Sequence, residues 1–169
     1  MGQGMNTLPH SDEDYAAFID KNVHTYLPKF HGYGMDPAGF HPGWNWAAFF
    51  FTFWWFLYRK MYVWAVICFA TLWVPYFNIL VWIGWGVAAN CLYFKHSTAK
   101  IAEIKSLQGG SYRVYLRGIG GVNGWVPWLA LLVSGGFFLL VILGFLGMAF
   151  LTSAWVASWV VPFTPGVAI

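Results

Sequence analysis

Charged residues are scarce in this chain, because only 9% of its 169 residues are Asp, Glu, Lys or Arg while 59% are hydrophobic. So little charge cannot cover the surface of an ordinary soluble domain. We therefore expect a membrane protein with a few spans and one small polar region. Residues 1–15 also lack the basic start, apolar core and cleavage site of a signal peptide, so we expect the N-terminus to be retained.

Catalytic and metal-binding side chains are equally few. The two cysteines lie in apolar surroundings without a neighbouring base, and we interpret them as small buried hydrophobic residues. His24, His31 and Asp36 could be considered as metal ligands, but their spacing matches no standard zinc pattern. Glu103 is the only acidic residue after position 36. We therefore expect no metal, no cofactor and no enzyme activity.

The long apolar segments contain no ionisable Asp, Glu, Lys, Arg or His at all. This holds for residues 61–75, 79–94 and 128–152. Proton relays and ion-coupled transporters place such groups within the membrane, and a transmembrane haem needs axial ligands there. The sequence therefore argues against both, unless partner subunits supply the ligands.

What the chain does have is aromatic residues, which make up 22% of it and include 12 Trp. They are densest in residues 44–60, which open the stretch WNWAAFFFTFWWFLYRKMY. Residues 44–58 would extend about 22 Å as a helix, which is less than the roughly 30 Å of a bilayer core. We predict an interfacial or re-entrant helix that anchors the chain at the membrane surface. The predicted anchoring residues are Trp44, Trp46, Trp54, Trp55, Tyr58, Arg59 and Lys60.

A transmembrane hairpin is predicted next, over residues 61–94. Pro75 and Asn78 interrupt this apolar stretch, so we expect two short helices, 61–75 and 79–94. Each arm is near the lower length limit for a span, and the hairpin either thins the bilayer or sits in it without fully crossing.

The C-terminal part of the chain divides into three predicted segments. Residues 95–126 form a basic cytoplasmic loop with a short surface helix, 127–152 form a long transmembrane helix, and 153–169 form an interfacial tail. Small residues allow helices to approach closely in lipid, so glycines in the hairpin and the long helix are predicted to pack against other helices. These are Gly84, Gly86, Gly135, Gly136, Gly144 and Gly147.

The polar N-terminal region, residues 1–43, is predicted to contain one amphipathic helix over 12–27. Ser11 can cap this helix and Pro28 would stop it. Its apolar stripe includes Tyr15, Phe18, Ile19 and Val23. Two interpretations stay open: the stripe covers the membrane surface or the protein's own loop, or it is the docking face of a partner.

The distribution of charge predicts the topology. Residues 1–43 carry five acidic and two basic side chains, whereas residues 59–117 carry seven basic and one acidic. Lys and Arg in short loops stay on the cytoplasmic side, so we place 95–126 and the N-terminus in the cytoplasm of a multi-pass protein of the bacterial inner membrane. Three or four spans result, depending on whether 44–58 crosses. The basic residues flank apolar segments, so lipid headgroups rather than nucleic acid are their expected partners.

The aromatic block WNWAAFFFTFWWFLYRKMY, followed by ANCLYFKH, resembles the bacterial membrane family of unknown function numbered 2628. The similarity covers roughly residues 15–121, including FIDKNVHTYLPKF and GIGG, and the last span looks like an extension. The resemblance implies the fold predicted above but no activity. The residues that carry it are Trp44, Trp46, Phe49, Arg59, Lys60, Asn90 and Tyr93.

The sequence as a whole predicts an all-α integral membrane protein that is not an enzyme. Its leading interpretation is an accessory or structural subunit of a membrane assembly, in contact with lipids and with a protein partner or further copies of itself. The alternative is a small oligomeric transporter or channel for a neutral or lipid-like substrate. Polar residues within the membrane would favour the alternative, and they are scarce.

Overall fold

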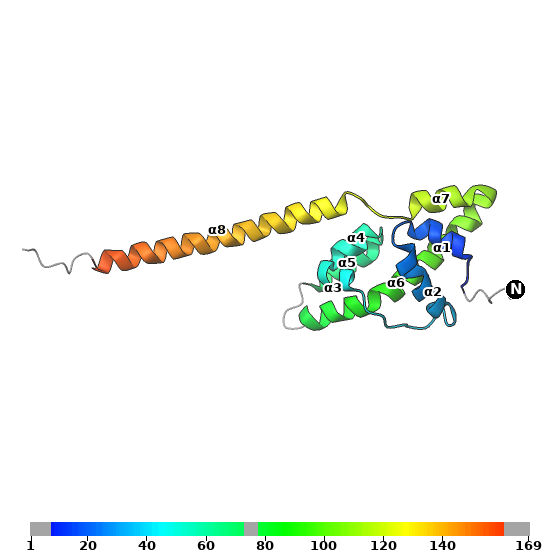
Figure 1. Ribbon diagram of the computed structural model, residues 1–169, viewed down its shortest axis with the longest axis horizontal. Coiled ribbons are helices and arrows are strands. Elements are labelled where there is room, and N and C mark those ends of the chain that lie inside the picture. Colours follow the sequence, from blue (N-terminus) through cyan, green and yellow to red (C-terminus); the bar gives the residue numbers. More distant parts are fainter. Residues whose placement is uncertain (1–7, 73–77, 161–169) are drawn as a thin grey trace, which may run out of the picture. The chain divides into compact units, whose positions relative to one another are not determined.

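The computed structural model describes residues 8–72 and 78–160, and all the regular structure in these ranges is helical (Figure 1). The all-α prediction is therefore confirmed. The chain divides into two compact units, residues 1–127 and 128–169, which are described separately.

The N-terminal region contains two helices in place of the single helix predicted over 12–27. Helix α1 spans Asp12–Ile19 and α2 spans Val23–Gly34. Asp20 and Asn22 adopt positive φ angles of 58° and 64°, which turns the chain between the helices. Pro28 lies inside α2 instead of ending it, so the predicted stop at this residue is wrong.

The aromatic segment predicted as one helix over 44–60 is also two short helices. Helix α3 spans Trp46–Phe51 and α4 spans Phe53–Tyr58. Thr52 separates them with a φ angle of 44°, a conformation that does not continue a right-handed helix. The Asn45 side chain caps α3 by accepting a hydrogen bond of 3.0 Å from the Ala48 N–H.

The predicted hairpin is present as α5, Tyr62–Thr71, and the beginning of α6, Asn78–Gln108. The second arm was predicted to end at residue 94. It instead continues through the basic segment, so this predicted end is wrong. No Gly or Pro occurs in residues 87–108, so nothing in the backbone interrupts the helix there. The predicted break at Pro75 lies outside the described residues. A short 3₁₀ turn, Gly109–Ser111, then leads into α7, Tyr112–Ile119.

The last helix, α8, spans Val126–Val160 and extends beyond the predicted span of 127–152. Residues 153–160 of the predicted tail are therefore helical, and the remainder of the tail lies outside the described residues. Over Val126–Trp159, α8 is long and apolar enough to cross a membrane. Among the described residues it is the only such helix, since α5 is too short.

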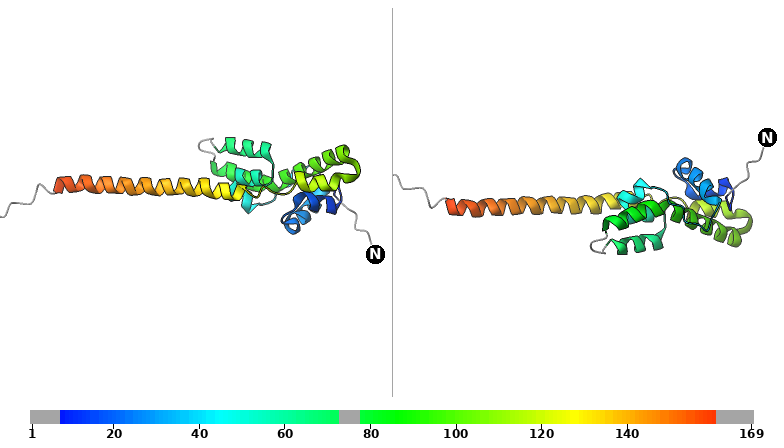
Figure 2. Two further views of the ribbon diagram at one scale, coloured as in Figure 1. Left: turned by 90° about the horizontal axis from the view of Figure 1, so that it is seen from above. Right: turned by 90° about the horizontal axis from the view of Figure 1, so that it is seen from below.

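Helix α6 organises the first unit. Its beginning packs against α3 and α5, and its later part packs against α1, α2 and α7 (Figures 1 and 2). We call residues 44–72 and 78–94 the apolar half, and residues 8–43 and 95–121 the polar half. A continuous core of mostly aromatic side chains joins them, whose largest fully buried members are Tyr15, Phe30, Phe56, Tyr93 and Phe94.

Candidate functional site

The predicted partner face lies inside the protein. Tyr15 and Ile19 are fully buried and Phe18 is 3% exposed, while Val23 packs against the same core. The stripe is covered by α6 and α7, which belong to the chain itself. The interpretation of this stripe as the docking face of a partner is therefore wrong, because its side chains are not exposed.

Arg59 was predicted to lie at the lipid headgroups, and it is instead 2% exposed. Its Nη1 donates hydrogen bonds to the Ile19 carbonyl at 3.2 Å and to the Tyr93 hydroxyl at 3.4 Å, and its Nη2 donates to the Lys21 carbonyl at 3.2 Å. The anchoring role is therefore wrong for Arg59. The residue joins α4 to the corner between α1 and α2.

The positive charge of Arg59 is balanced without an ion pair to any described carboxylate. Its guanidinium carbon lies 4.5 Å from the centre of the Tyr26 ring and 5.0 Å from that of Tyr93. The carbonyls that it contacts follow the C-terminal end of α1, where the helix dipole is negative. Its Nε has no hydrogen-bond partner in the described structure. We call this arrangement the Arg59 clasp.

Lys60 makes a second connection between the two halves. Its ammonium group donates hydrogen bonds to the carbonyls of Gly118, at 3.1 Å, and Gly120, at 2.5 Å. These carbonyls belong to the end of α7, and the neighbouring Gly121 N–H donates to the Phe18 carbonyl of α1. The amine of Lys60 therefore binds protein carbonyls and holds the turn between α4 and α5 against the polar half.

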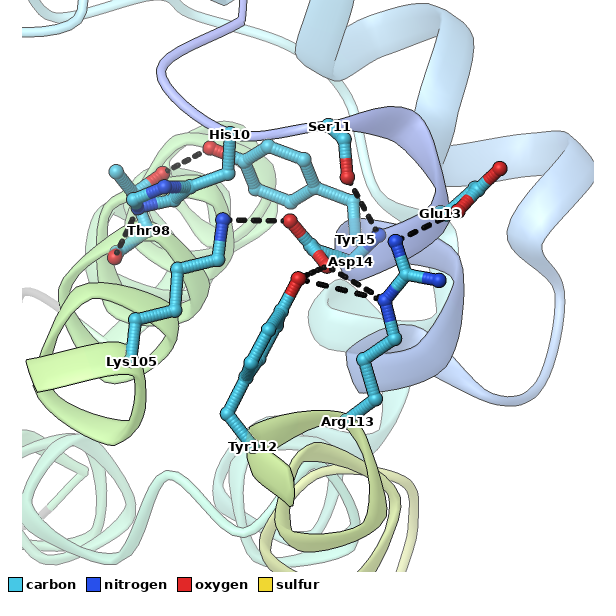
Figure 3. A network of polar contacts seen from close by, with 9 residues as sticks. All are labelled: His10, Ser11, Glu13, Asp14, Tyr15, Thr98, Lys105, Tyr112 and Arg113. Carbon is cyan, nitrogen blue, oxygen red and sulfur yellow. Dashed lines mark hydrogen bonds and ion pairs between the residues drawn. The ribbon is translucent and has the colours of Figure 1, made fainter. Parts of the chain in front are cut away.

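A network of charged side chains surrounds Asp14 in the polar half (Figure 3). The Asp14 carboxylate is 1% exposed and lies 2.6 Å from the Lys105 ammonium. It also accepts a hydrogen bond of 3.1 Å from the Tyr112 hydroxyl. Arg113 lies 3.7 Å from Asp14 and forms a closer ion pair, of 2.8 Å, with the exposed Glu13. This network fastens α1 to the end of α6 and to α7.

The network determines how its groups ionise. Burial alone would raise the pKa of Asp14, but hydrogen bonds from Lys105, Ser11 and Tyr112, with the charge of Lys105, outweigh burial and lower it. Burial raises the pKa of the neighbouring Tyr15 to about 12, although its hydroxyl contacts Thr98 Oγ1 at 2.7 Å. Asp14 is therefore a structural anion, and Tyr15 stays neutral at physiological pH.

Two asparagines form the polar centre of the apolar half. Asn45 Nδ2 donates a 2.9 Å hydrogen bond to Asn90 Oδ1, and Asn90 Nδ2 donates to the carbonyls of Gly43 and Trp44, both at 3.1 Å. Asn90 is fully buried and Asn45 is 7% exposed. We call this pair the asparagine bridge, because it fastens the start of α3 onto α6. An Asn in an apolar run was the signal that could have revealed it.

Large apolar side chains point outward from the hairpin, and small ones point inward. On α5, Val63 and Val66 are 71% and 68% exposed, whereas Ala65 and Cys68 are buried. On α6, Ile79, Leu80 and Ile83 are exposed, while Gly86 and Ala89 are buried. Soluble helices have the opposite arrangement, with their large apolar side chains in the core.

The predicted anchoring aromatic residues are divided between surface and core. Trp46 is 63% exposed and Trp44 is 37% exposed. Trp54 and Tyr58 are half-buried, and Trp55, at 5% exposed, belongs to the core. Trp44 and Trp46 can therefore reach a membrane interface, whereas Trp55 cannot.

The glycines predicted to pack between helices also differ among themselves. A Cβ on Gly86 would lie 3.1 Å from the Cβ of Phe49, so the absence of a side chain allows α3 to approach α6. A Cβ on any of the other five would meet no atom within 4 Å, so their packing role stays a prediction. They are Gly84, Gly135, Gly136, Gly144 and Gly147.

Within the described residues, no three or more His, Cys, Asp or Glu side chains are grouped so that they could hold a metal ion. His31, one of the ligands considered from sequence, lies 3.1 Å from the Asp12 carboxylate. Asp36 instead accepts a hydrogen bond from the Gly39 N–H. Both cysteines are free thiols and buried, as predicted.

No family model matches the chain, and no curated protein or solved structure is found to be similar to it. The resemblance of residues 15–121 to the membrane family of unknown function stays a prediction.

Proposed function

We propose that this chain is a non-catalytic protein of the bacterial inner membrane that acts as an accessory or structural subunit of a membrane assembly. Helix α8 anchors it, and the polar half of the first unit lies in the cytoplasm, where it is available to a partner. Membrane lipids and one protein partner are the ligands that this function requires.

The surface of α8 is the observation that supports membrane insertion most strongly. No charged residue occurs in Val126–Trp159, and none of its most apolar part is buried inside the protein. A helix that is apolar on all sides has to be covered by something other than water. Over 34 residues it would extend about 50 Å, which exceeds the roughly 30 Å of the hydrocarbon core and allows a tilted span.

A non-catalytic role is supported by the way the protein uses its acidic side chains. Four of them, Asp12, Glu13, Asp14 and Glu103, contact basic side chains of the same chain. A fifth, Asp36, closes a turn. These carboxylates are engaged in holding helices and turns together, which is what a structural role requires.

A cytoplasmic polar half is supported by the sequence of charges along the chain. Arg113 and Arg117 precede α8 closely, and Lys95, Lys100 and Lys105 follow the hairpin. By the positive-inside rule this side of both membrane segments faces the cytoplasm, and α8 then runs outward.

Native mass spectrometry of the tagged full-length protein, extracted from its own membranes in mild detergent, tests this function. A second protein at fixed stoichiometry is the expected result. A homo-oligomer that retains a small molecule or lipid would replace the proposal with the transporter or channel alternative. Recovery of the protein from the soluble fraction would contradict membrane anchoring itself.

A further inference from the structure

We propose that the hairpin of α5 and the beginning of α6 is a second membrane element, which enters one leaflet of the bilayer and returns to the side from which it came. The exposed apolar side chains of the hairpin contact the lipid acyl chains of that leaflet. This inference rests on the proposed function, because it takes α8 to be inserted in the same membrane.

The distribution of side chains on the hairpin favours lipid as the surrounding medium. Val63, Val66 and Ile67 are exposed on one face of α5 at helical spacings of three and four. The opposite face buries Ala65 and Cys68. Small residues between helices and large aliphatic residues outside are typical of helices in lipid, where close packing replaces the hydrophobic effect.

Two polar side chains of the hairpin, Thr71 and Trp85, satisfy each other. Thr71 Oγ1 donates a 2.7 Å hydrogen bond to the Cys68 carbonyl and accepts one of 3.0 Å from the Trp85 indole N–H. Deeper polar atoms without partners would be costly in hydrocarbon. Trp85 and Thr71 therefore join the two arms without offering a hydrogen bond to water.

The lengths of both arms fit one leaflet. Helix α5 has 10 residues and extends about 15 Å. On α6 the stretch from Asn78 to the buried Asn90 would extend about 18 Å. A bilayer core of roughly 30 Å needs about 20 residues to cross, so each arm covers about half of it.

The segment that leads into α8 is fastened to the base of the hairpin, at the turn between α4 and α5. Asn123 lies three residues before α8, and its Nδ2 donates hydrogen bonds to the Leu57 carbonyl at 2.8 Å and to the Tyr62 hydroxyl at 3.1 Å. The Asn123 N–H also donates to the Tyr58 carbonyl. The chain therefore leads into α8 from the turn at which α5 begins, and only a few residues of sequence separate the base of the hairpin from α8.

Basic side chains mark the base of both arms. Lys60 precedes α5 by two residues, and Lys95 follows the apolar part of α6. Lys95 Nζ contacts the Ala38 carbonyl at 2.9 Å and is exposed, so it can also reach lipid phosphates. No basic residue occurs between these two lysines in the sequence.

Spin-label accessibility in the full-length protein, reconstituted in phosphatidylethanolamine–phosphatidylglycerol liposomes, tests this inference. In a background with Cys68→Ala and Cys91→Ala, single labels are introduced by Val66→Cys, Ala70→Cys and Leu80→Cys. Val114→Cys is the matched control, because Val114 on α7 is 75% exposed and Val66 is 68% exposed. Leu140→Cys reports on α8.

Labels on the hairpin should be relaxed by oxygen and protected from an aqueous nickel chelate, with protection greater at Ala70 than at Val66. The label at Val114 should show the opposite behaviour. If Val66 and Leu80 respond to nickel as Val114 does while Leu140 stays protected, the hairpin lies outside the bilayer and the inference is wrong. Nickel access that rises from Val66 to Ala70 would show a crossing hairpin and also overturn it. Nickel access at Leu140 would instead contradict the proposed function.

Discussion

The two halves of α6 differ in what they leave exposed, although they belong to one uninterrupted helix. Its beginning exposes Ile79, Leu80 and Ile83 and packs small residues against α3. Its end exposes Lys100 and Glu103, which form an ion pair of 2.7 Å, and packs Ile101 and Ile104 against the polar half. This difference is what the proposed insertion of the hairpin predicts, with hydrocarbon around the beginning of α6 and water around its end.

The two halves share one aromatic core, and polar groups add a second kind of connection at the turn between α4 and α5. The Arg59 clasp and the Lys60 hydrogen bonds tie the turn between α4 and α5 to the ends of α1 and α7. Changes at Arg59 or Lys60 should therefore loosen this turn from the polar half, without removing the shared core.

Removing the Arg59 side chain should lower the free energy of unfolding more than any other change considered. Arg59→Ala leaves the buried Ile19 carbonyl and the partly buried Lys21 carbonyl without this donor and opens a cavity, so the free energy of unfolding should fall by about 3 kcal/mol. Trypsin cleavage after Lys21 should accelerate in the same variant. Both are measured on detergent-solubilised protein by denaturant titration and limited proteolysis.

The matched control for the clasp is Thr25→Ala, an exposed change near the same corner that leaves both carbonyls and Arg59 intact. It should unfold and be cleaved like the unmodified protein. Equal stability of Arg59→Ala and the control would show that the halves do not depend on the clasp.

Breaking the asparagine bridge in the apolar half should lower the free energy of unfolding by about 2 kcal/mol. Asn90→Ala removes the donor to the Gly43 and Trp44 carbonyls and the acceptor for Asn45. A double-mutant cycle with Asn45→Ala, followed by thermal unfolding, measures the coupling. The double variant should be more stable than the sum of single effects predicts, and strict additivity would mean that the two side chains act independently.

Neutralising Asp14 should lower the free energy of unfolding by about 1.5–3 kcal/mol at neutral pH, the range for hydrogen bonds to charged groups. The folded-state pKa of Asp14 is lowered, so its contribution is complete above the unfolded pKa and is lost as pH falls through the folded one. Unfolding measured from pH 6 to pH 2 should therefore show a smaller decline in Asp14→Asn than in the unmodified protein. Parallel declines would contradict a stabilising Asp14 carboxylate.

Removing the ion pair between Glu13 and Arg113, beside Asp14, should change the free energy of unfolding least. Glu13→Gln removes the partner of Arg113, but the two side chains are 74% and 56% exposed. Such pairs contribute under about 1 kcal/mol, so the free energy of unfolding should fall by less than about 0.5 kcal/mol, and this difference should shrink as salt is added. A loss as large as that of Asp14→Asn would place the exposed pair, rather than the buried carboxylate, at the centre of the network.

Local pattern predicted much of the secondary structure. The all-helical class, the hairpin and the long apolar helix followed from hydrophobic runs and their lengths, and Ser11 was correctly placed as a cap. The breaks at Asn22 and Thr52 were missed, because neither Gly nor Pro marks these positive φ angles. The continuation of α6 past residue 94 was missed because the change from apolar to basic residues was interpreted as the end of a helix.

The candidate sites were harder to predict, because they depend on contacts distant in sequence. An Arg beside a Lys after an aromatic run suggests two anchors, yet Arg59 is enclosed by Tyr26 and Tyr93. Their proximity follows from the tertiary packing of α2 and α6, which no local pattern reveals. Asp14 likewise finds Lys105 across α1 and α6.

The most direct test of two media is photo-crosslinking of the unmodified full-length protein in liposomes that contain a phospholipid with a diazirine in its acyl chain. Peptide mapping should find crosslinks on α3, α5, the beginning of α6 and α8, and none on α1, α2 or α7. Crosslinks confined to α8 would show that the apolar half does not contact hydrocarbon and would contradict the account.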